Sequence, residues 1–149
     1  MLHGHTDRAA MASSAKFGLT IIGGRERVAY PDIESTENPD TAESTNTNFV
    51  EHLHPDGNWT FQPKFNEDLA LDEEGSYAQP ISHLAVLNVN EEIWAIGGYN
   101  HIPGRLRRCF RLTLPYDCES IFQPNCIAYW KRLPDLLTPR SAFSATIVE

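Results

Sequence analysis

Histidine pairs with alternate spacing are the residues in this chain best suited to bind a metal. His3 and His5 form one pair, and His52 and His54 form another. Residues two apart on a β-strand share a face, so each pair could offer two imidazole ligands to one ion. Zinc sites normally use three or four ligands, and neither pair has a third at suitable spacing. We therefore expect surface histidines near turns, with no metal and no cofactor.

Nucleophilic catalysis would require a serine, cysteine or threonine beside a base, as in the Gly-x-Ser-x-Gly motif, which the sequence lacks. The cysteines Cys109, Cys118 and Cys126 are an odd number without Cys-x-x-Cys spacing, so neither a disulfide framework nor a zinc site is indicated. Basic residues precede Cys109 alone, and its immediate neighbour on a strand would face the other way. We expect reduced thiols, a cytoplasmic protein and no enzymatic activity.

One basic cluster stands out in an acidic chain. It comprises Arg105, Arg107, Arg108 and Arg111, whereas the chain of 149 residues carries a net charge of -8. An acidic chain is poorly suited to broad contact with nucleic-acid phosphates, so we expect no nucleic-acid partner. The cluster is either a solvated strand edge or a contact for an acidic peptide or protein surface. Since no apolar run approaches the ~20 residues that span a bilayer, we also expect no membrane segment.

Short apolar segments that end in glycine or turn residues must position these side chains. Residues 17–22 run into Gly23-Gly24, and residues 93–96 run into Gly97-Gly98. Residues 110–114 alternate between apolar and polar, which is the period of a half-buried strand. No stretch combines helical periodicity with helix caps. The chain therefore reads as all-β and antiparallel, with inserted loops at 31–48, 66–75 and 115–125.

The sequence contains an internal repeat. The segment around Arg8 aligns with the segment around Arg140, and residues 79–85 fit between them with Ile81 in place of the arginine. A glycine pair follows each of the first two segments, and a tryptophan follows each glycine pair at a similar distance. A proline then stands four residues after each tryptophan. Features that recur in the same order at similar distances indicate a repeat.

This ordered set resembles the kelch motif, most closely at residues 93–99 and 130–140, and the resemblance covers nearly the whole chain. It implies a fragment of a kelch-type β-propeller with four-stranded antiparallel blades and long inserted loops. The first blade would span 6–78 and the second 79–138, and 139–149 would supply the first strand of a third. The motif residues would be Arg8, Gly23, Gly24, Trp59, Gly97, Gly98, Trp130 and Arg140.

Two features depart from the family pattern. Both repeats are longer than the roughly 50 residues typical of kelch, and the inserted loops account for the excess. Two blades and one strand also fall short of a closed ring, which typically needs 4–8 blades. We expect the missing blades to come from a longer chain, with assembly of several copies as the alternative.

The resemblance implies a binding scaffold for a protein or peptide, because loops at one end of such propellers carry the contacts. The residues that follow the glycine pairs are the candidates: Arg25, Arg27, Tyr30, Tyr99, Asn100, His101 and Arg105. Kelch proteins include substrate receptors of cullin-based ubiquitin ligases and actin-binding proteins. A galactose-oxidase-like copper enzyme fragment, with its tyrosine–cysteine crosslink, and a non-functional incomplete propeller are the alternatives.

Overall fold

The computed structural model describes residues 8–27, 44–46, 50–62, 81–100 and 104–148. These residues form twelve strands and no helix. Eight strands form two four-stranded sheets and the other four form two hairpins, all with antiparallel pairing. The expected all-β antiparallel class is confirmed. Within the described ranges, no helix exists that could cross a membrane.

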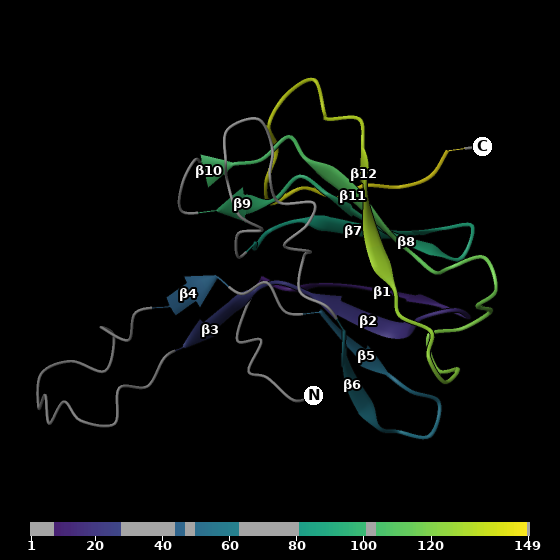
Figure 1. Ribbon diagram of the computed structural model, residues 1–149. Coiled ribbons are helices and arrows are strands. Elements are labelled where there is room, and N and C mark those ends of the chain that lie inside the picture. The colour runs from purple at the N-terminus through teal and green to yellow at the C-terminus, as the bar shows by residue number, and fades with distance from the viewer. Residues whose placement is uncertain (1–7, 28–43, 47–49, 63–80, 101–103, 149) are drawn as a thin grey trace, which may run out of the picture.

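Both sheets follow the chain as a simple meander (Figure 1). Sheet 1 consists of β1 (Ala10–Ser14), β2 (Gly18–Ile22), β5 (Val50–Leu53) and β6 (Trp59–Gln62). Sheet 2 consists of β7 (Ala85–Val89), β8 (Glu92–Ile96), β11 (Cys109–Thr113) and β12 (Tyr129–Leu133). In each sheet a hairpin separates the second strand from the third: β3 (Arg25–Arg27) with β4 (Ser44–Asn46), and β9 (Tyr99–Asn100) with β10 (Gly104–Arg105).

The two sheets also match in strand register. Each has one cross-strand pair next to the glycine pair and another at the tryptophan. These pairs are Ile22–Val50 and Leu53–Trp59 in sheet 1, and Ile96–Cys109 and Leu112–Trp130 in sheet 2. From the glycine pair to the tryptophan, the sequence repeat is therefore a structural repeat.

The glycine pairs let the chain entering one unit pass close to the unit before it. Gly24 N–H donates to Ile81 O at 2.8 Å, and Gly98 N–H donates to Arg140 O at the same distance. A Cβ on Gly97 would lie 2.7 Å from Arg140 O, and its φ of 59° is a conformation that glycine adopts readily. Any side chain at Gly97 would push the entering chain away.

The start of the first unit lies in a different register from the sequence alignment. Arg8, His83 and Ala142 share left-handed backbones, with φ of 61°, 55° and 52°. His83 N–H donates to Arg8 O at 3.1 Å, and Ala142 N–H donates to His83 O at 2.9 Å. Arg8 is thus the counterpart of His83 and Ala142, whereas the sequence alignment placed it over Ile81 and Arg140. This register depends on left-handed backbones and on hydrogen bonds between units, which an alignment of residue types does not show.

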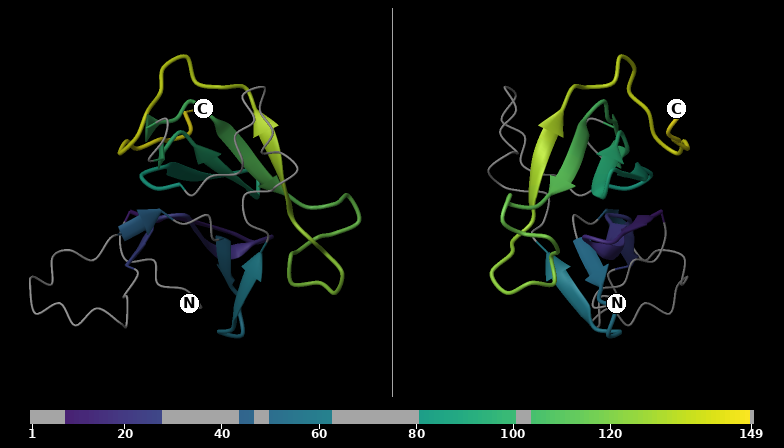
Figure 2. Two further views of the ribbon diagram at one scale, coloured as in Figure 1. Left: turned by 60° about the vertical axis from the view of Figure 1, so that its left-hand side comes forward. Right: turned by 90° about the vertical axis from the view of Figure 1, so that its right-hand side faces the viewer.

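One hydrophobic core lies between the two sheets, which stack one above the other in Figure 2. Ile22 and Val50 of sheet 1 share this core with Ile93, Leu112 and Trp130 of sheet 2, and all five are almost fully buried. The counterpart of Ile22 in sheet 2 is Ile96, which points to the opposite face from Ile93 because side chains alternate along a strand. The sheets therefore stack front to back, with equivalent faces pointing the same way.

The chain after β12 lies along sheet 2 without forming a strand within residues 141–148. Arg140 makes an antiparallel bridge to Leu106, and Phe143 packs against Gly97. This is the segment expected to be the first strand of a third blade, and it begins with the contacts made by the chain entering β7. A strand needs a neighbouring strand to pair with, and none lies beside 141–148 among the described residues.

Candidate functional site

The hairpins that follow the two glycine pairs lie at the same end of the molecule (Figure 1). Arg25 begins β3 and is half-buried, and Arg27 ends the same strand. Tyr99 begins β9, and Arg105 ends β10. Tyr30 and His101 lie outside the described residues, as do most of the 31–48 loop and all of the 66–75 loop. The structure thus brings the described candidate residues to one end of the two sheets.

Backbone hydrogen bonds fix the β9–β10 hairpin on both sides. Ser82 N–H donates to Tyr99 O at 3.0 Å, and Tyr99 N–H donates to Ser82 O at 2.7 Å. On the other side, Leu106 N–H donates to Gly98 O at 2.9 Å, and Arg140 N–H donates to Leu106 O at 3.0 Å. The chain entering β7 and the chain leaving β12 therefore both hold the described strands of this hairpin in place.

The exposed chemistry of this hairpin is aromatic and basic. Tyr99 is 37% exposed, and its ring meets the His83 ring edge-on at 6.0 Å between centroids. The His83 ring is held by Ser82, whose Oγ lies 2.8 Å from His83 Nδ1. Arg105 is exposed, whereas Asn100 is 7% exposed and serves the interior of the hairpin. Tyr99, His83 and Arg105 together suit a partner that carries carboxylates and apolar groups.

The basic cluster of the sequence does not form one patch. Arg107 Nε donates to Leu136 O at 2.9 Å, and Arg111 pairs with Glu92 at 3.0 Å on sheet 2. Burial, and after it the nearby charge of Arg132, lowers the pKa of Arg108. Three of the four arginines thus have local contacts in the fold, and Arg105 is the one that belongs to the hairpin end.

His52 is not a surface histidine, contrary to expectation. It is fully buried between the sheets, with Nδ1 at 2.8 Å from Thr20 Oγ1 and 3.2 Å from Phe17 O. Thr20 Oγ1 can donate to Nδ1, and Nδ1 can donate to the Phe17 carbonyl, so the tautomer of the ring decides which of these hydrogen bonds forms. Burial lowers the pKa of His52 to about 4, against the raising effect of the Phe17 carbonyl. The sequence shows only the alternate spacing of His52 and His54. That spacing does not predict whether the face of the strand that carries His52 is covered by another sheet.

His54 faces the same side of sheet 1 but serves a different contact. Its Nε2 lies 2.8 Å from Thr60 Oγ1, and its ring packs against Phe122 at 4.1 Å between centroids. His3 and His5 lie outside the described residues. Across the part of the chain that the structure describes, no group of three or more histidine, cysteine or acidic residues is placed to hold a metal ion.

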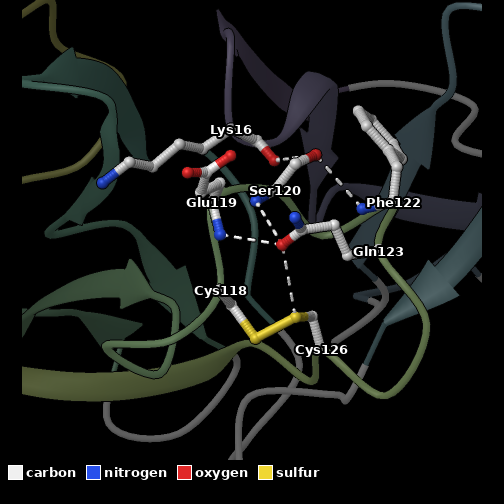
Figure 3. Close-up of a disulfide and its surroundings, with 7 residues drawn as sticks. All are labelled: Lys16, Cys118, Glu119, Ser120, Phe122, Gln123 and Cys126. Atoms are coloured by element: carbon white, nitrogen blue, oxygen red, sulfur yellow. Dashed lines mark hydrogen bonds between the residues drawn. A yellow bond between two sulfur atoms is a disulfide. The ribbon is translucent and has the colours of Figure 1, made fainter.

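The cysteines contradict the expectation of reduced thiols. Cys118 and Cys126 form a disulfide, with 5.8 Å between their Cα atoms (Figure 3). Both lie in the loop between β11 and β12, so the bridge closes a short segment and leaves no framework pattern in the sequence. Cys109 is the free cysteine, and burial raises the pKa of its thiol, which disfavours the thiolate.

Comparisons with known proteins give no family for this chain. No protein-family model matches the sequence. A search of curated proteins finds none with significant similarity. The kelch resemblance therefore stands on the repeat itself.

Proposed function

We propose that this chain is a protein-interaction scaffold built from stacked kelch-type repeat units, which binds a protein or peptide through its hairpin end. The observation that carries the proposal is the front-to-back stacking of two sheets with the same strand order and register. Equivalent faces point the same way, so the outer face of sheet 2 corresponds to the face of sheet 1 that sheet 2 covers. Stacks of this kind extend by adding units, as in propellers.

Residues 140–148 make the first contacts of a chain that enters a further unit, and in this proposal such a unit follows sheet 2. The chain entering a third unit already accepts from Gly98 N–H at Arg140 O, as Ile81 O accepts from Gly24 N–H. In this proposal further units stack on the outer face of sheet 2. Thermal unfolding of the 149-residue chain, followed by circular dichroism and light scattering, tests it. Aggregation without a cooperative transition supports a need for further units, and a cooperative transition of a soluble monomer contradicts it.

The proposed binding surface consists of Tyr99, His83 and Arg105 on the hairpin end of sheet 2. Its partner is a peptide or protein surface with carboxylates, because Arg105 is exposed beside a half-exposed tyrosine. Roles as a ubiquitin-ligase adaptor or an actin-binding protein follow from the family resemblance alone. Cytoplasmic localisation was expected from reduced thiols, and the Cys118–Cys126 disulfide removes that support.

Selection from a random peptide library against the immobilised chain tests the binding surface. We expect enriched peptides to be acidic, and Tyr99→Ala or Arg105→Glu to weaken their binding about tenfold or more in fluorescence anisotropy. Lys131→Glu is the matched control, because Lys131 is exposed on β12, away from the hairpin. Equal weakening by Lys131→Glu would mean that net charge governs binding. If the enriched peptides bind both hairpin variants as tightly as the natural chain, the binding site lies elsewhere.

A further inference from the structure

The loop between β11 and β12 links sheet 2 to sheet 1. We call residues 115–128 the clasp loop. It leaves the end of sheet 2 opposite the β9–β10 hairpin and reaches the turns of sheet 1 (Figure 2). Ile121 N–H donates to Lys16 O at 3.0 Å, and Ser120 Oγ donates to the same carbonyl at 3.3 Å. Lys16 lies in the turn between β1 and β2, so a loop of one unit is anchored on its neighbour.

Apolar contacts accompany these hydrogen bonds. Ile121 is 6% exposed and belongs to the core between the sheets. The Phe122 ring packs on His54 in the turn between β5 and β6, and it occupies the space where a Cβ on Gly18 would lie. Residues 120–122 of the clasp loop thus contact both turns at this end of sheet 1.

The disulfide closes the clasp loop around these contacts. The contact residues Ser120, Ile121 and Phe122 all lie between Cys118 and Cys126 in the sequence. Figure 3 shows Ser120 and Phe122 beside the bridge. Gln123 organises the same segment, because its Oε1 accepts from Glu119 N–H at 2.8 Å and lies 3.6 Å from Cys126 Sγ. The bridge therefore restricts the part of the loop that docks, and docking in turn holds the two cysteines near each other.

We propose that the Cys118–Cys126 disulfide is a reducible clasp: oxidised, it holds the loop on sheet 1, and a dithiol reductant releases it. Neither cysteine is fully buried, so the reductant has access to the bridge. Release would free Ile121 and Phe122 and uncover the turns of sheet 1 that they contact. This inference is independent of the proposed peptide-binding surface, which lies at the opposite end of the sheets.

The chemistry is a thiol–disulfide exchange. One thiolate of the dithiol attacks a sulfur of the bridge, forming a mixed disulfide and releasing the other cysteine as a thiolate. The second thiol of the dithiol, as its thiolate, then displaces the remaining cysteine. Two electrons pass to the cysteine pair, which takes up two protons, and the reductant leaves as a cyclic disulfide.

Reduction of the full chain with dithiothreitol, followed by alkylation and hydrogen exchange, tests the first half of the proposal. We expect Cys118 and Cys126 to be alkylated while Cys109 is protected, because Cys109 is buried in sheet 2. Exchange at Ile121 N–H should speed up about tenfold or more, and exchange at Gly97 N–H, bonded to Arg108 O, should stay unchanged. Alkylation of Cys109, or unchanged exchange at Ile121, would overturn the proposal.

Two variants test whether the bridge and the docking depend on each other. Ile121→Ser removes the docked side chain and leaves the cysteines in place, so we expect the reduction equilibrium in dithiothreitol to shift about tenfold toward the dithiol. Ile127→Ser is the matched control, because Ile127 is 67% exposed and lies outside the bridged segment. An equal shift with both variants, or no shift with Ile121→Ser, would contradict the coupling.

The double variant Cys118→Ser, Cys126→Ser should behave like the reduced chain. We expect its melting temperature to fall by about 5–10 °C and to be insensitive to dithiothreitol. If this variant fails to fold, the exchange measurement on the reduced natural chain still decides the question. A double variant that retains slow exchange at Ile121 would show that the bridge does not hold the loop.

Discussion

Equivalent positions on the two sheets carry side chains of different chemistry. On the covered face of sheet 1, the cross-strand row consists of Thr20, His52 and Thr60. The same row in sheet 2, on the face that points away from sheet 1, consists of Trp94, Arg111 and Lys131. Backbone register is thus the same in both units, and the side chains differ with what covers them. The sheet repeats, and each face is adapted to its own surroundings.

The two rows also differ in the polar contacts that their side chains make. His52 is buried as a neutral ring within hydrogen-bond distance of Thr20 Oγ1 and the Phe17 carbonyl, and Thr20 is buried with it. Arg111 forms an ion pair with the Glu92 carboxylate, with the two side chains 31% and 22% exposed. A covered face thus contains a neutral hydrogen-bonded group, and a partly solvated face contains an ion pair. Burial without neutralisation would cost far more.

The tryptophans are the strongest test of the comparison. Trp130 is 1% exposed in the core between the sheets, whereas Trp59 is half-buried on the far face of sheet 1. Trp130→Ala should lower the free energy of unfolding by about 3–5 kcal/mol, and Trp59→Ala by about half as much. Urea unfolding of both variants measures the difference. Equal losses would mean that the far face of sheet 1 is covered as well as the core.

The buried histidine provides a test by pH. Its pKa falls from 6.5 in the unfolded chain to about 4 in the folded one, so the unfolded state binds more protons between these values. Stability is therefore fully present above pH 6.5 and is lost as the pH falls toward 4. The full contribution is about 3 kcal/mol.

His52→Asn is the matched variant for this prediction, because its side-chain amide can donate and accept hydrogen bonds but does not titrate. Urea unfolding from pH 7 to pH 4 should show a steeper loss of stability for the natural chain than for the variant. Parallel pH profiles would mean that His52 titrates alike in both states.

The sequence predicted the repeated antiparallel strands. It did not predict the features that depend on contacts between the sheets. The residue types at Gly97 and Trp130 were open to sequence reasoning, because close chain approach and a large buried ring restrict them strongly. The register of Arg8 was not, since it depends on left-handed backbones and hydrogen bonds between units. Burial of His52 and pairing of Cys118 with Cys126 arise from contacts between sheets and from the path of one loop. Residue spacing alone carries no signal for either.

The ion pair on the outer face of sheet 2 should give the smallest effect. Arg111→Met keeps most of the aliphatic stem and removes the charge that meets Glu92, while Thr113 Oγ1 still donates to the other oxygen of that carboxylate at 3.0 Å. Because both partners are partly solvated, we expect a loss below about 1 kcal/mol at low salt and less at high salt. A double-mutant cycle with Glu92→Gln isolates the pairwise part. A coupling several times larger would mean that this face is covered in solution, as sheet 2 covers the equivalent face of sheet 1.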